Sequence, residues 1–345
     1  MRKLLLKNTV AVLGLAFVLA GCSAAKANNN TGQAGEEAAA ANNGKAKDKG
    51  TVVVNIGTQG ISLLSLSHEK GWIDEAFAAA GAEIKFTDFP SGPPHFEAIA
   101  AGHLDFGLVG NGPVIAGQAG DIDFKEIAVI SDGKRGDTIL VHEDSGIKDV
   151  ADLKGKKVAV AKGSSAYAFV YRAAVQQGLK PSDIELIQLQ PDEAQPAFQS
   201  KAVDAWAVWE PYVTLATNQG AVGIADGEKL NLASPSFAIA RGKFAEEHPE
   251  LVTLFLKELD RIITWSSEHP EETAKFFTEK KKVDADLIQL LLSKSHYSVE
   301  PVSEDYVKAQ QETADLLFET GGIRKQIDVS KVVENRFVEE AFQGK

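Results

Sequence analysis

The sequence predicts an α/β protein with two sheets, and two observations support that prediction. From Thr51 onward, short runs rich in β-branched residues alternate with helical patterns of roughly ten to fifteen residues. The alternation falls into two stretches, 51–137 and 138–234, and each holds about four strand and helix units. Two such stretches favour two sheets of mainly parallel strands, and therefore two lobes.

Strands are expected where β-branched and aromatic residues form short runs between turn residues. These runs are residues 52–56, 82–86, 104–108, 126–130, 138–141, 157–161, 184–189, 205–209 and 237–240. After Arg241 the pattern is nearly all helical, with helices expected over 250–267, 271–281, 286–293 and 304–320. A helical tail most simply packs back on the first lobe. Lobe 1 is then discontinuous, made of 51–137 and 235–345, and lobe 2 is 138–234.

The N-terminus has the order of a secretory signal peptide. Three basic residues precede an uncharged apolar run over 10–20, which is shorter than the about 20 apolar residues of a membrane-spanning helix. The segment Leu19-Ala20-Gly21-Cys22 resembles the lipobox of bacterial lipoproteins. That resemblance implies removal of residues 1–21 and lipidation of Cys22. An ordinary secretory signal followed by a free thiol is the alternative.

A flexible linker is expected between Cys22 and the first strand. Residues 23–50 contain no aromatic and no branched aliphatic residue, so they cannot bury enough apolar area to offset the entropy of ordering. Residues 22–50 are thus a lipidated cysteine with its tether. Cys22 is the sole cysteine, so neither an internal disulfide nor a cysteine-based metal cluster is expected.

The charge balance limits the class of partner. The chain has a formal net charge of −12, and removal of the three basic residues of the signal peptide takes it to −15. An acidic surface argues against nucleic acid and against an anionic lipid surface as partners. A small anionic ligand stays possible, because backbone N–H groups can make a cleft locally positive.

Candidate site residues follow the predicted strands, because ligands of open α/β sheets sit outside the carboxyl ends of strands. Five segments present Gly, Ser, Asn or an aromatic residue just before a predicted helix: 57–62, 88–94, 110–113, 162–165 and 209–212. A helix start offers free N–H donors and the positive end of its dipole to an anion. Ser91, Asn111, Ser164 and Ser165 are therefore candidates for an anion site, with capping of their own helices as the alternative role.

Aromatic residues near these segments have two expected roles. Trp206 and Trp209 lie three apart on a predicted strand and so face opposite sides of the sheet. Trp206 is expected in the core, and Trp209, at the end of the strand, is expected to reach the cleft. Ordinary packing is expected for Phe89, Tyr212 and Phe237, with an apolar wall of the cleft as their alternative role.

Searches for catalytic and metal motifs give no match. The seven histidines include no H-E-x-x-H pair and no two at metal-ligand spacing. Residues 163–166 do not form a G-x-S-x-G elbow, residues 110–112 lack the third glycine of a dinucleotide loop, and the sequence has no P-loop. We therefore expect no catalytic site, no cofactor and no metal.

Five segments resemble the aliphatic-sulfonate-binding proteins of ATP-binding-cassette importers: 89–94, 149–160, 162–165, 204–212 and 311–316. The stretch 149–160 is shared with relatives that bind taurine, nitrate or thiamine precursors. F-P-S-G-P-P and D-A-W-A-V-W-E-P-Y are more specific to the sulfonate branch. The resemblance implies an α/β, two-lobed periplasmic-binding-protein fold of the second type, with its ligand in the cleft between the lobes.

By position, the resemblance also implies ligand contacts from Gln59, Gly60, Ser91, Gly92, Gly110, Asn111, Ser164, Ser165, Trp209 and Ser236. Relatives usually carry Gly-Asp where this chain has Gly110-Asn111, so one negative charge is missing near the expected site. A sulfonate has no proton to donate. A site made only of donors therefore suits it, whereas a carboxylate acceptor would select protonated phosphate.

The expected function is that of a monomeric, extracytoplasmic lipoprotein that captures an alkanesulfonate for sulfur acquisition. Hinge closure would present the ligand to a membrane permease. Binding of taurine, nitrate or a pyrimidine precursor is one alternative, and a sensor acting on a membrane kinase is another. A desulfinase-like enzyme is disfavoured, because desulfinases of this fold use a cysteine in the cleft and the only cysteine here is Cys22.

Overall fold

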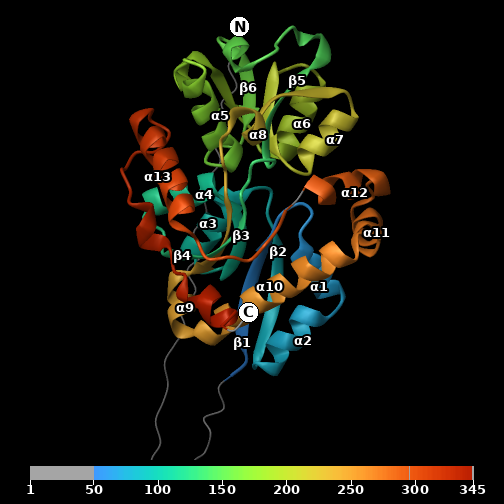
Figure 1. Cartoon of the computed structure of the whole chain (residues 1–345), viewed down its shortest axis with the longest axis vertical. Helices are drawn as coiled ribbons and strands as arrows, with labels where there is room; N and C mark the ends of the chain where they lie inside the picture. Colours follow the sequence, from blue (N-terminus) through green and yellow to red (C-terminus); the bar gives the residue numbers. More distant parts are fainter. Residues whose placement is uncertain (1–49, 295, 344–345) are drawn as a thin grey trace, which may run out of the picture. The chain divides into compact units, whose positions relative to one another are not determined.

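The computed structural model describes residues 50–343 except residue 295. The predicted signal peptide, Cys22 and the linker up to residue 49 lie outside the described residues. Within the described chain, two five-stranded sheets alternate with helices, one sheet in each of two lobes (Figure 1). The predicted α/β fold class is therefore confirmed. No helix in this part of the chain is long and apolar enough to span a bilayer.

The sheet of lobe 1 has the strand order β2-β1-β3-β10-β4. Its strands are β1 (Val52–Thr58), β2 (Ala82–Asp88), β3 (Phe106–Gly110), β4 (Phe124–Ser131) and β10 (Ser236–Arg241). The chain reaches β10 only after it has built the second lobe, and β10 then lies between β3 and β4. Lobe 1 thus contains strands that precede lobe 2 in the sequence and one strand that follows it.

The sheet of lobe 2 has the order β7-β6-β8-β5-β9. Its strands are β5 (Asp137–His142), β6 (Lys157–Val160), β7 (Glu185–Gln188), β8 (Ala205–Trp209) and β9 (Ala221–Asp226). All nine predicted strands are present, and β9 is an addition. The strand β9 lies at an edge of the sheet, is only partly buried and contains Gly223, so its sequence carries a weak strand signal.

Both sheets are mixed: four strands of each run in one direction, in line with the expectation of mainly parallel strands, and one strand runs against them. In lobe 1, β1 pairs in parallel with β2 and β3, whereas β10 runs antiparallel to β3 and β4. In lobe 2, β6 pairs in parallel with β7 and β8, whereas β5 runs antiparallel to β8 and β9. The strands β5 and β10 are those by which the chain enters each sheet after crossing from the other. Alternation of strands and helices does not encode the direction of such strands.

Helices separate most strands and form most of the chain after β10. They are α1 (Leu63–Glu69), α2 (Trp72–Ala79), α3 (Gly92–Ala100), α4 (Asn111–Ala119), α5 (Ser165–Gln176), α6 (Pro191–Gln199), α7 (Tyr212–Asn218), α8 (Gly227–Leu230), α9 (Gly242–Glu247), α10 (Pro249–Glu268), α11 (Pro270–Lys281), α12 (Ala285–Lys294), α13 (Glu304–Glu319) and α14 (Arg336–Ala341). Short 3₁₀ helices occupy Glu143–Ser145, Val150–Leu153, Pro181–Asp183 and Val329–Val332. The four helices predicted in the tail are α10 to α13.

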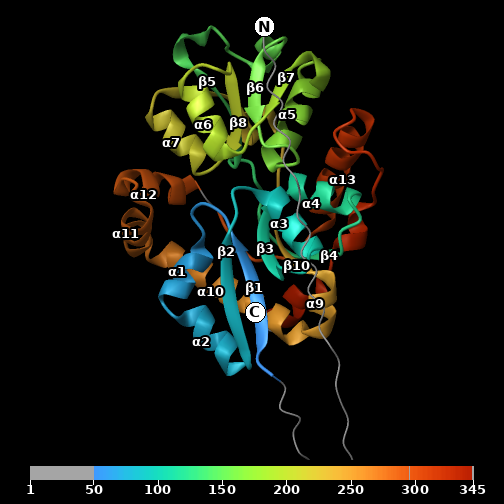
Figure 2. The ribbon, with the colours of Figure 1, turned by 180° about the vertical axis from the view of Figure 1, so that it is seen from behind.

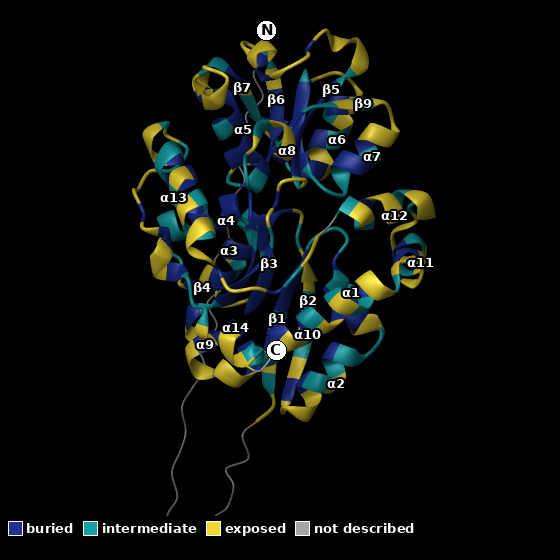
Figure 3. Cartoon of the chain, in the orientation of Figure 1, coloured by how far each residue is buried: buried dark blue, intermediate teal, exposed yellow. Residues whose placement is uncertain are grey.

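The C-terminal tail packs on lobe 1 mainly through α10. Its buried residues recur three or four positions apart and join the core of the first sheet: Leu251, Val252, Phe255, Leu256 and Leu259. The helix contacts α1, α2 and α14, and α1 and α2 lie beside it in Figure 2. Figure 3 shows that β3 and β5 are largely buried, while α11, α12 and α13 keep exposed faces. The predicted packing of the tail on lobe 1 is therefore present.

The tail also touches lobe 2. Helix α13 contacts α5, and its residues Ala314 and Leu317 belong to the same apolar cluster as Phe169 and Val170 of α5. Helix α12 contacts α7. The chain crosses from lobe 1 to lobe 2 between β4 and β5 and returns between β9 and β10. The lobe limits of 51–137 with 235–345, and of 138–234, stay predictions.

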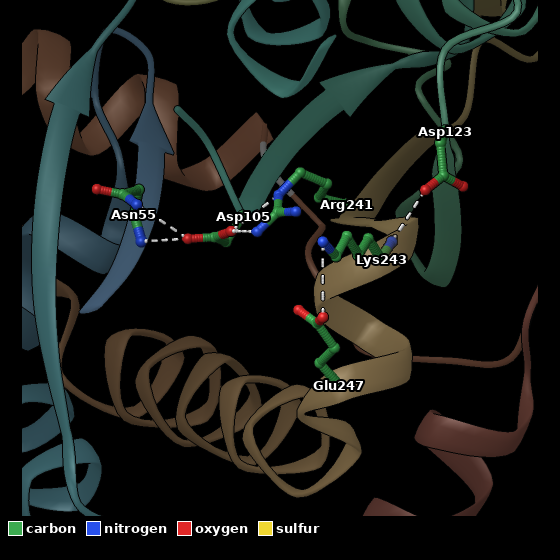
Figure 4. A network of polar contacts seen from close by, with 6 residues as sticks. All are labelled: Asn55, Asp105, Asp123, Arg241, Lys243 and Glu247. Carbon is green, nitrogen blue, oxygen red and sulfur yellow. Dashed lines mark hydrogen bonds and ion pairs between the residues drawn. The ribbon is translucent and has the colours of Figure 1, made fainter. Parts of the chain in front are cut away.

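A polar network joins three strands of the first sheet (Figure 4). The Asp105 carboxylate accepts hydrogen bonds from the backbone N and Nδ2 of Asn55 on β1, at 2.9 and 3.0 Å. It also accepts from Nε and Nη2 of Arg241, at 3.0 and 2.6 Å. Asp105 precedes β3, and Arg241 ends β10. The network therefore attaches the returning strand β10 to the strands formed earlier in the chain.

Candidate ligand-binding site

A cavity of about 290 Å³, the central cavity, is lined by residues that begin or follow strands of both sheets. Lobe 1 contributes the segments after β1, β2 and β3 and the start of β10. Lobe 2 contributes the start of β5 and the segments after β6 and β8. The carboxyl ends of the parallel strands therefore meet the cavity, as expected for a ligand site in an α/β fold.

Most of the residues predicted to contact a ligand line the central cavity. Eight of the ten do so: Gln59, Gly60, Gly92, Gly110, Ser164, Ser165, Trp209 and Ser236. The other two, Ser91 and Asn111, are fully buried next to the lining residues Gly92 and Gly110. The fold thus brings together strand ends that are far apart in the sequence.

The starts of α3, α4 and α5 meet at the central cavity, and glycines allow their close approach. A Cβ atom at Gly92 would lie 2.3 Å from Cγ of Pro113 in the first turn of α4. A Cβ atom at Gly112 would lie 2.1 Å from the carbonyl oxygen of Ser164, the residue before α5. Nonbonded carbon atoms pack at about 3.5–4.0 Å, so any side chain here would push the helix starts apart.

The three helix starts present the positive ends of their dipoles and backbone N–H groups, except at Pro93 and Pro94 of α3 and Pro113 of α4, which have no N–H. Each such end stabilises an anion by about 0.3–1 kcal/mol when exposed and by up to ~2 kcal/mol when partly buried. Ser164 is the N-cap of α5, because its Oγ accepts a 3.1 Å hydrogen bond from the backbone N of Tyr167. Capping is therefore the role of the Ser164 side chain, whereas the Ser165 side chain points to another partner.

Ser91 and Asn111 hold buried polar atoms for which the described chain offers no hydrogen-bond partner. Ser91 precedes α3, yet its Oγ makes no capping bond. Asn111 begins α4, and neither atom of its side-chain amide is paired with a described residue. An unpaired buried polar group costs about 1–3 kcal/mol. Both residues lie at converging helix starts, and their contact with a ligand stays a prediction.

Asp137, the first residue of β5, adds a carboxyl group that is absent from the residues predicted from the sequence. Ser165 Oγ donates a 2.7 Å hydrogen bond to Asp137 Oδ1, and Asp137 is only 3% exposed. Burial raises the pKa of Asp137 to about 7, although the Ser165 hydroxyl and the positive charge of Arg172 act in the opposite direction. Near neutral pH much of Asp137 is therefore the uncharged acid.

This carboxyl changes the predicted chemistry of the site. A site made only of donors suits a sulfonate, and ionised Asp137 adds an acceptor to the lining of this cavity. Asp137 is a single acid at the predicted lobe boundary and belongs to no motif, so no sequence signal distinguishes it from a solvated charge. Only the tertiary structure places it against Ser165.

Basic side chains that the sequence does not single out also line the central cavity: Lys134, Arg135, Lys294 and His296. Nε of Arg135 lies 2.8 Å from Oε1 of Glu228, and Nζ of Lys294 lies 3.1 Å from Oε1 of Glu210. Lys134 and Arg135 come from the crossing after β4, and the other two come from the end of α12 and the residues after it. Four acids, Asp132, Asp137, Glu210 and Glu228, also line the cavity, so its charged side chains bring no excess of positive charge.

Trp209 gives the central cavity an aromatic wall, as predicted. Its ring lies 6.3 Å from that of Tyr212 at 90°, and both residues line the cavity. Trp206 is 2% exposed and lies in the core of lobe 2, which confirms the different roles predicted for the two tryptophans. Phe237 is buried and Phe89 packs against the core of lobe 1, as expected, whereas Tyr212, for which packing is also expected, lines the cavity.

The side chains near the cavity do not form a metal centre. Among the described residues, no group of His, Cys, Asp and Glu side chains could hold a metal ion. His95 is fully buried, and burial lowers its pKa to about 4. Its ring fills the space beside Gly57 and Gly107, where an added Cβ would lie 2.6 and 2.7 Å from the imidazole. His95 is therefore a neutral packing residue.

Comparison with known proteins agrees with this architecture. A model of the NMT1/THI5-like family matches residues 63–273. A protein of Bacillus subtilis (strain 168) with the provisional name of an aliphatic sulfonates-binding protein is 44% identical over 339 residues, which is 98% of this chain and 97% of the relative.

Solved structures show the same fold. The periplasmic aliphatic sulphonate binding protein SsuA from Escherichia coli has a TM-score of 0.73 and 32% identity, over 82% of this chain and 92% of that one. The alkanesulfonate-binding protein SsuA from Xanthomonas axonopodis pv. citri, bound to MOPS, has a TM-score of 0.77 and 30% identity, over 82% and 98%. The predicted two-lobed periplasmic-binding-protein fold is confirmed. The family model matches more than half of the chain, and this chain belongs to the NMT1/THI5-like family.

Proposed function

We propose that this chain captures an aliphatic sulfonate outside the cytoplasm and delivers it to the permease of an ATP-binding-cassette importer. The convergence of α3, α4 and α5 on one cavity carries the proposal, because three helix starts together offer donors and positive dipole ends to a permanent anion. The names of the Bacillus, Escherichia and Xanthomonas relatives support a sulfonate as that anion.

In the proposed complex the sulfonate headgroup lies against the helix starts at Ser91, Asn111 and Ser165. Its oxygens accept hydrogen bonds and carry no proton, so N–H and O–H donors match them. The carbon chain leaves the headgroup toward Trp209. Gln59 and Ser236, which also line the cavity, complete the polar contacts in this proposal.

Hinge closure about the two crossings between the lobes would bury the ligand and form the surface that the permease recognises. Closure requires that the ligand prefer the closed state, because a ligand with equal affinity for both states shifts nothing. The proposed limits of the moving bodies are 51–137 with 235–345 for lobe 1, and 138–234 for lobe 2.

The proposal includes export and a lipid anchor at the N-terminus. Residues 1–21 act as a signal peptide, Cys22 carries the lipid, and residues 22–50 form the tether. Two or more acyl chains hold a protein stably on a membrane, whereas one does not. The anchored protein acts as a monomer. A desulfinase-like role has no support, because residues 50–345 include no cysteine.

Ligand-induced stabilisation of the full chain tests the proposal. The panel holds alkanesulfonates, taurine, sulfate, nitrate and a pyrimidine precursor, and the readouts are thermal unfolding and tryptophan fluorescence. At 100 times its dissociation constant, a true ligand stabilises the folded state by about 2.7 kcal/mol. Stabilisation by the pyrimidine alone, with every sulfonate silent, would overturn the sulfonate assignment.

A further inference from the structure

A second cavity of about 430 Å³ adjoins the central cavity. The two cavities share the lining residues Gly60, Ile61, Pro90, Pro211 and Tyr212. These residues come from the segments after β1, β2 and β8, so both lobes contribute to the boundary between the cavities. The two cavities therefore adjoin each other at these five residues.

The walls of the second cavity are mainly apolar. Helix α7 contributes Leu215, and the segment from the end of α11 through α12 contributes Val283, Leu287, Ile288 and Leu291. Ile288 and Leu291 are buried, whereas Leu287 and Leu215 are partly exposed. Helix α12 lies beside α7 in both views of the ribbon (Figures 1 and 2). The tail of the chain thus closes an apolar space against lobe 2.

A polar contact holds α12 over this space. Nζ of Lys294, the last residue of α12, lies 3.1 Å from Oε1 of Glu210 and donates a 2.9 Å hydrogen bond to Oγ1 of Thr214. Glu210 in turn accepts a 3.0 Å hydrogen bond from the backbone N of Thr214 through Oε2. The end of α12 is therefore attached to the start of α7.

The charges around the second cavity oppose an anion. Asp88, Asp192 and Lys281 line it and are exposed, so acids outnumber bases among its charged lining residues. Burial raises the pKa of Tyr212, and the negative charges of Asp192 and Asp88 raise it further. The positive helix starts belong to the central cavity instead. The two cavities therefore fix the direction of an amphiphilic anion, with the headgroup in the central cavity.

We propose that the second cavity binds the hydrocarbon chain of the sulfonate, so that this protein selects long or bulky apolar sulfonates over short or zwitterionic ones. The inference rests on the proposed function, because it requires the headgroup to lie in the central cavity. Each methylene that leaves water on binding contributes about 0.8 kcal/mol, which is a factor of about four in affinity. A sulfonate whose hydrocarbon chain of several carbons fills the second cavity should therefore bind with a much higher affinity.

Calorimetric titration of the full chain with methane-, propane-, hexane- and octanesulfonate, and with taurine, tests this. Affinity should rise about two- to fourfold per methylene and then level off when the cavity is full. Propanesulfonate should bind more tightly than taurine. Equal affinity along the series, or a preference for taurine, would overturn the inference while leaving sulfonate binding in place. Failure of every sulfonate to bind would instead overturn the proposed function.

A pair of variants on one helix locates the hydrocarbon chain. Leu287→Asn puts a polar group into the wall of the second cavity, whereas Leu290→Asn changes an exposed residue of α12 that is not among its lining residues. Leu287→Asn should lower the affinity for octanesulfonate about tenfold or more, and the affinity for methanesulfonate much less. Leu290→Asn should leave both affinities unchanged. An equal loss of affinity for octanesulfonate and methanesulfonate in Leu287→Asn would show that the hydrocarbon chain lies elsewhere.

Discussion

The Ser165 hydroxyl donates to the carboxylate of Asp137 across 2.7 Å, inside the cavity where the sulfonate headgroup is proposed to bind. While Asp137 is ionised, it holds the Ser165 proton and places a negative charge near the anion. Once Asp137 is protonated, the acid can donate to Ser165 Oγ, and the Ser165 proton becomes free for a sulfonate oxygen. Ligand binding and protonation of Asp137 are therefore expected to favour each other.

This pair predicts that sulfonate affinity falls as the pH rises through about 7. Burial raises the pKa of Asp137 to about 7, so the uncharged acid predominates below that pH and the repelling carboxylate above it. One proton is involved, so the loss of sulfonate affinity should approach tenfold per pH unit above the pKa of Asp137. Asp137→Asn should bind with an affinity that does not change with pH. Calorimetric titration from about pH 6 to about pH 8 gives the profile.

The control for this profile is His296→Gln, because His296 also lines the cavity and carries an ionisable ring. The pH dependence should survive in His296→Gln. Sulfonates keep their charge throughout, so the ligand adds no titration of its own. A wild-type affinity that is flat with pH, or a slope that only His296→Gln removes, would contradict the role of Asp137.

The same pKa predicts the pH dependence of folding. The pKa of Asp137 is raised from 3.8 to about 7 in the folded state, so folding favours the protonated form. Its contribution to stability is fully present at low pH and is lost as the pH rises from about 4 to about 7. Glu126, whose pKa burial raises to about 8, adds a similar loss. In urea unfolding, Asp137→Asn should lose less stability over this range than the wild type.

Substitution of Ser165 tests whether it contacts the headgroup. Ser165→Ala removes one donor, and a hydrogen bond to a charged group contributes about 1.5–3 kcal/mol, so affinity at about pH 6 should fall roughly tenfold or more. Ser165→Asp adds a negative charge beside Asp137 and should weaken binding by at least another tenfold. Ser164→Ala should mainly remove the cap of α5, at about 1 kcal/mol of stability. Unchanged affinity in Ser165→Asp would exclude the contact.

Substitution of Gly112 tests whether sulfonate binding depends on the close approach of the helix starts. Gly112→Ala places Cβ 2.1 Å from the Ser164 carbonyl oxygen, so α4 and α5 must move apart. We expect a loss of about 1–3 kcal/mol in the free energy of unfolding, together with weaker sulfonate binding. Gly120→Ala, at the other end of α4, has its nearest neighbours at 3.4 Å and should leave affinity unchanged. Wild-type affinity in Gly112→Ala would show that the approach of the helix starts does not matter for binding.

Substitution of Asp105 tests whether its polar network, which lies away from the cavity, stabilises the fold. It lies before β3, at the end opposite to Gly110, and it forms a partly buried ion pair with Arg241 (Figure 4). Asp105→Asn should destabilise the fold by about 3 kcal/mol, because it leaves Arg241 without its counter-charge. Lys243→Ala breaks only an exposed pair with Glu247 and should cost under about 1 kcal/mol. Denaturant unfolding measures both, and sulfonate affinity should stay at its wild-type value in each.

Local sequence pattern accounts for much of the fold. The period of apolar residues marks α10, and the run Ala205–Trp209 marks β8, because helices and strands repeat their buried positions at different intervals. The same reasoning predicts that strand ends and helix starts supply the site, and Gly110, Ser165 and Trp209 do line the central cavity. The directions of β5 and β10 lie beyond this reasoning, since they depend on which strands each pairs with.

The sequence by itself determined the alternation of strands and helices, the helical tail and the glycine-rich and serine-rich helix starts, because each depends on residues close together in the chain. Only the tertiary structure decided that Ser165 bonds to Asp137, that Lys294 reaches Glu210, and that α12 closes a second cavity. These contacts join residues that are tens of positions apart. The packing of the two lobes and the burial of side chains decide which of these residues come into contact, and a local sequence pattern does not predict either.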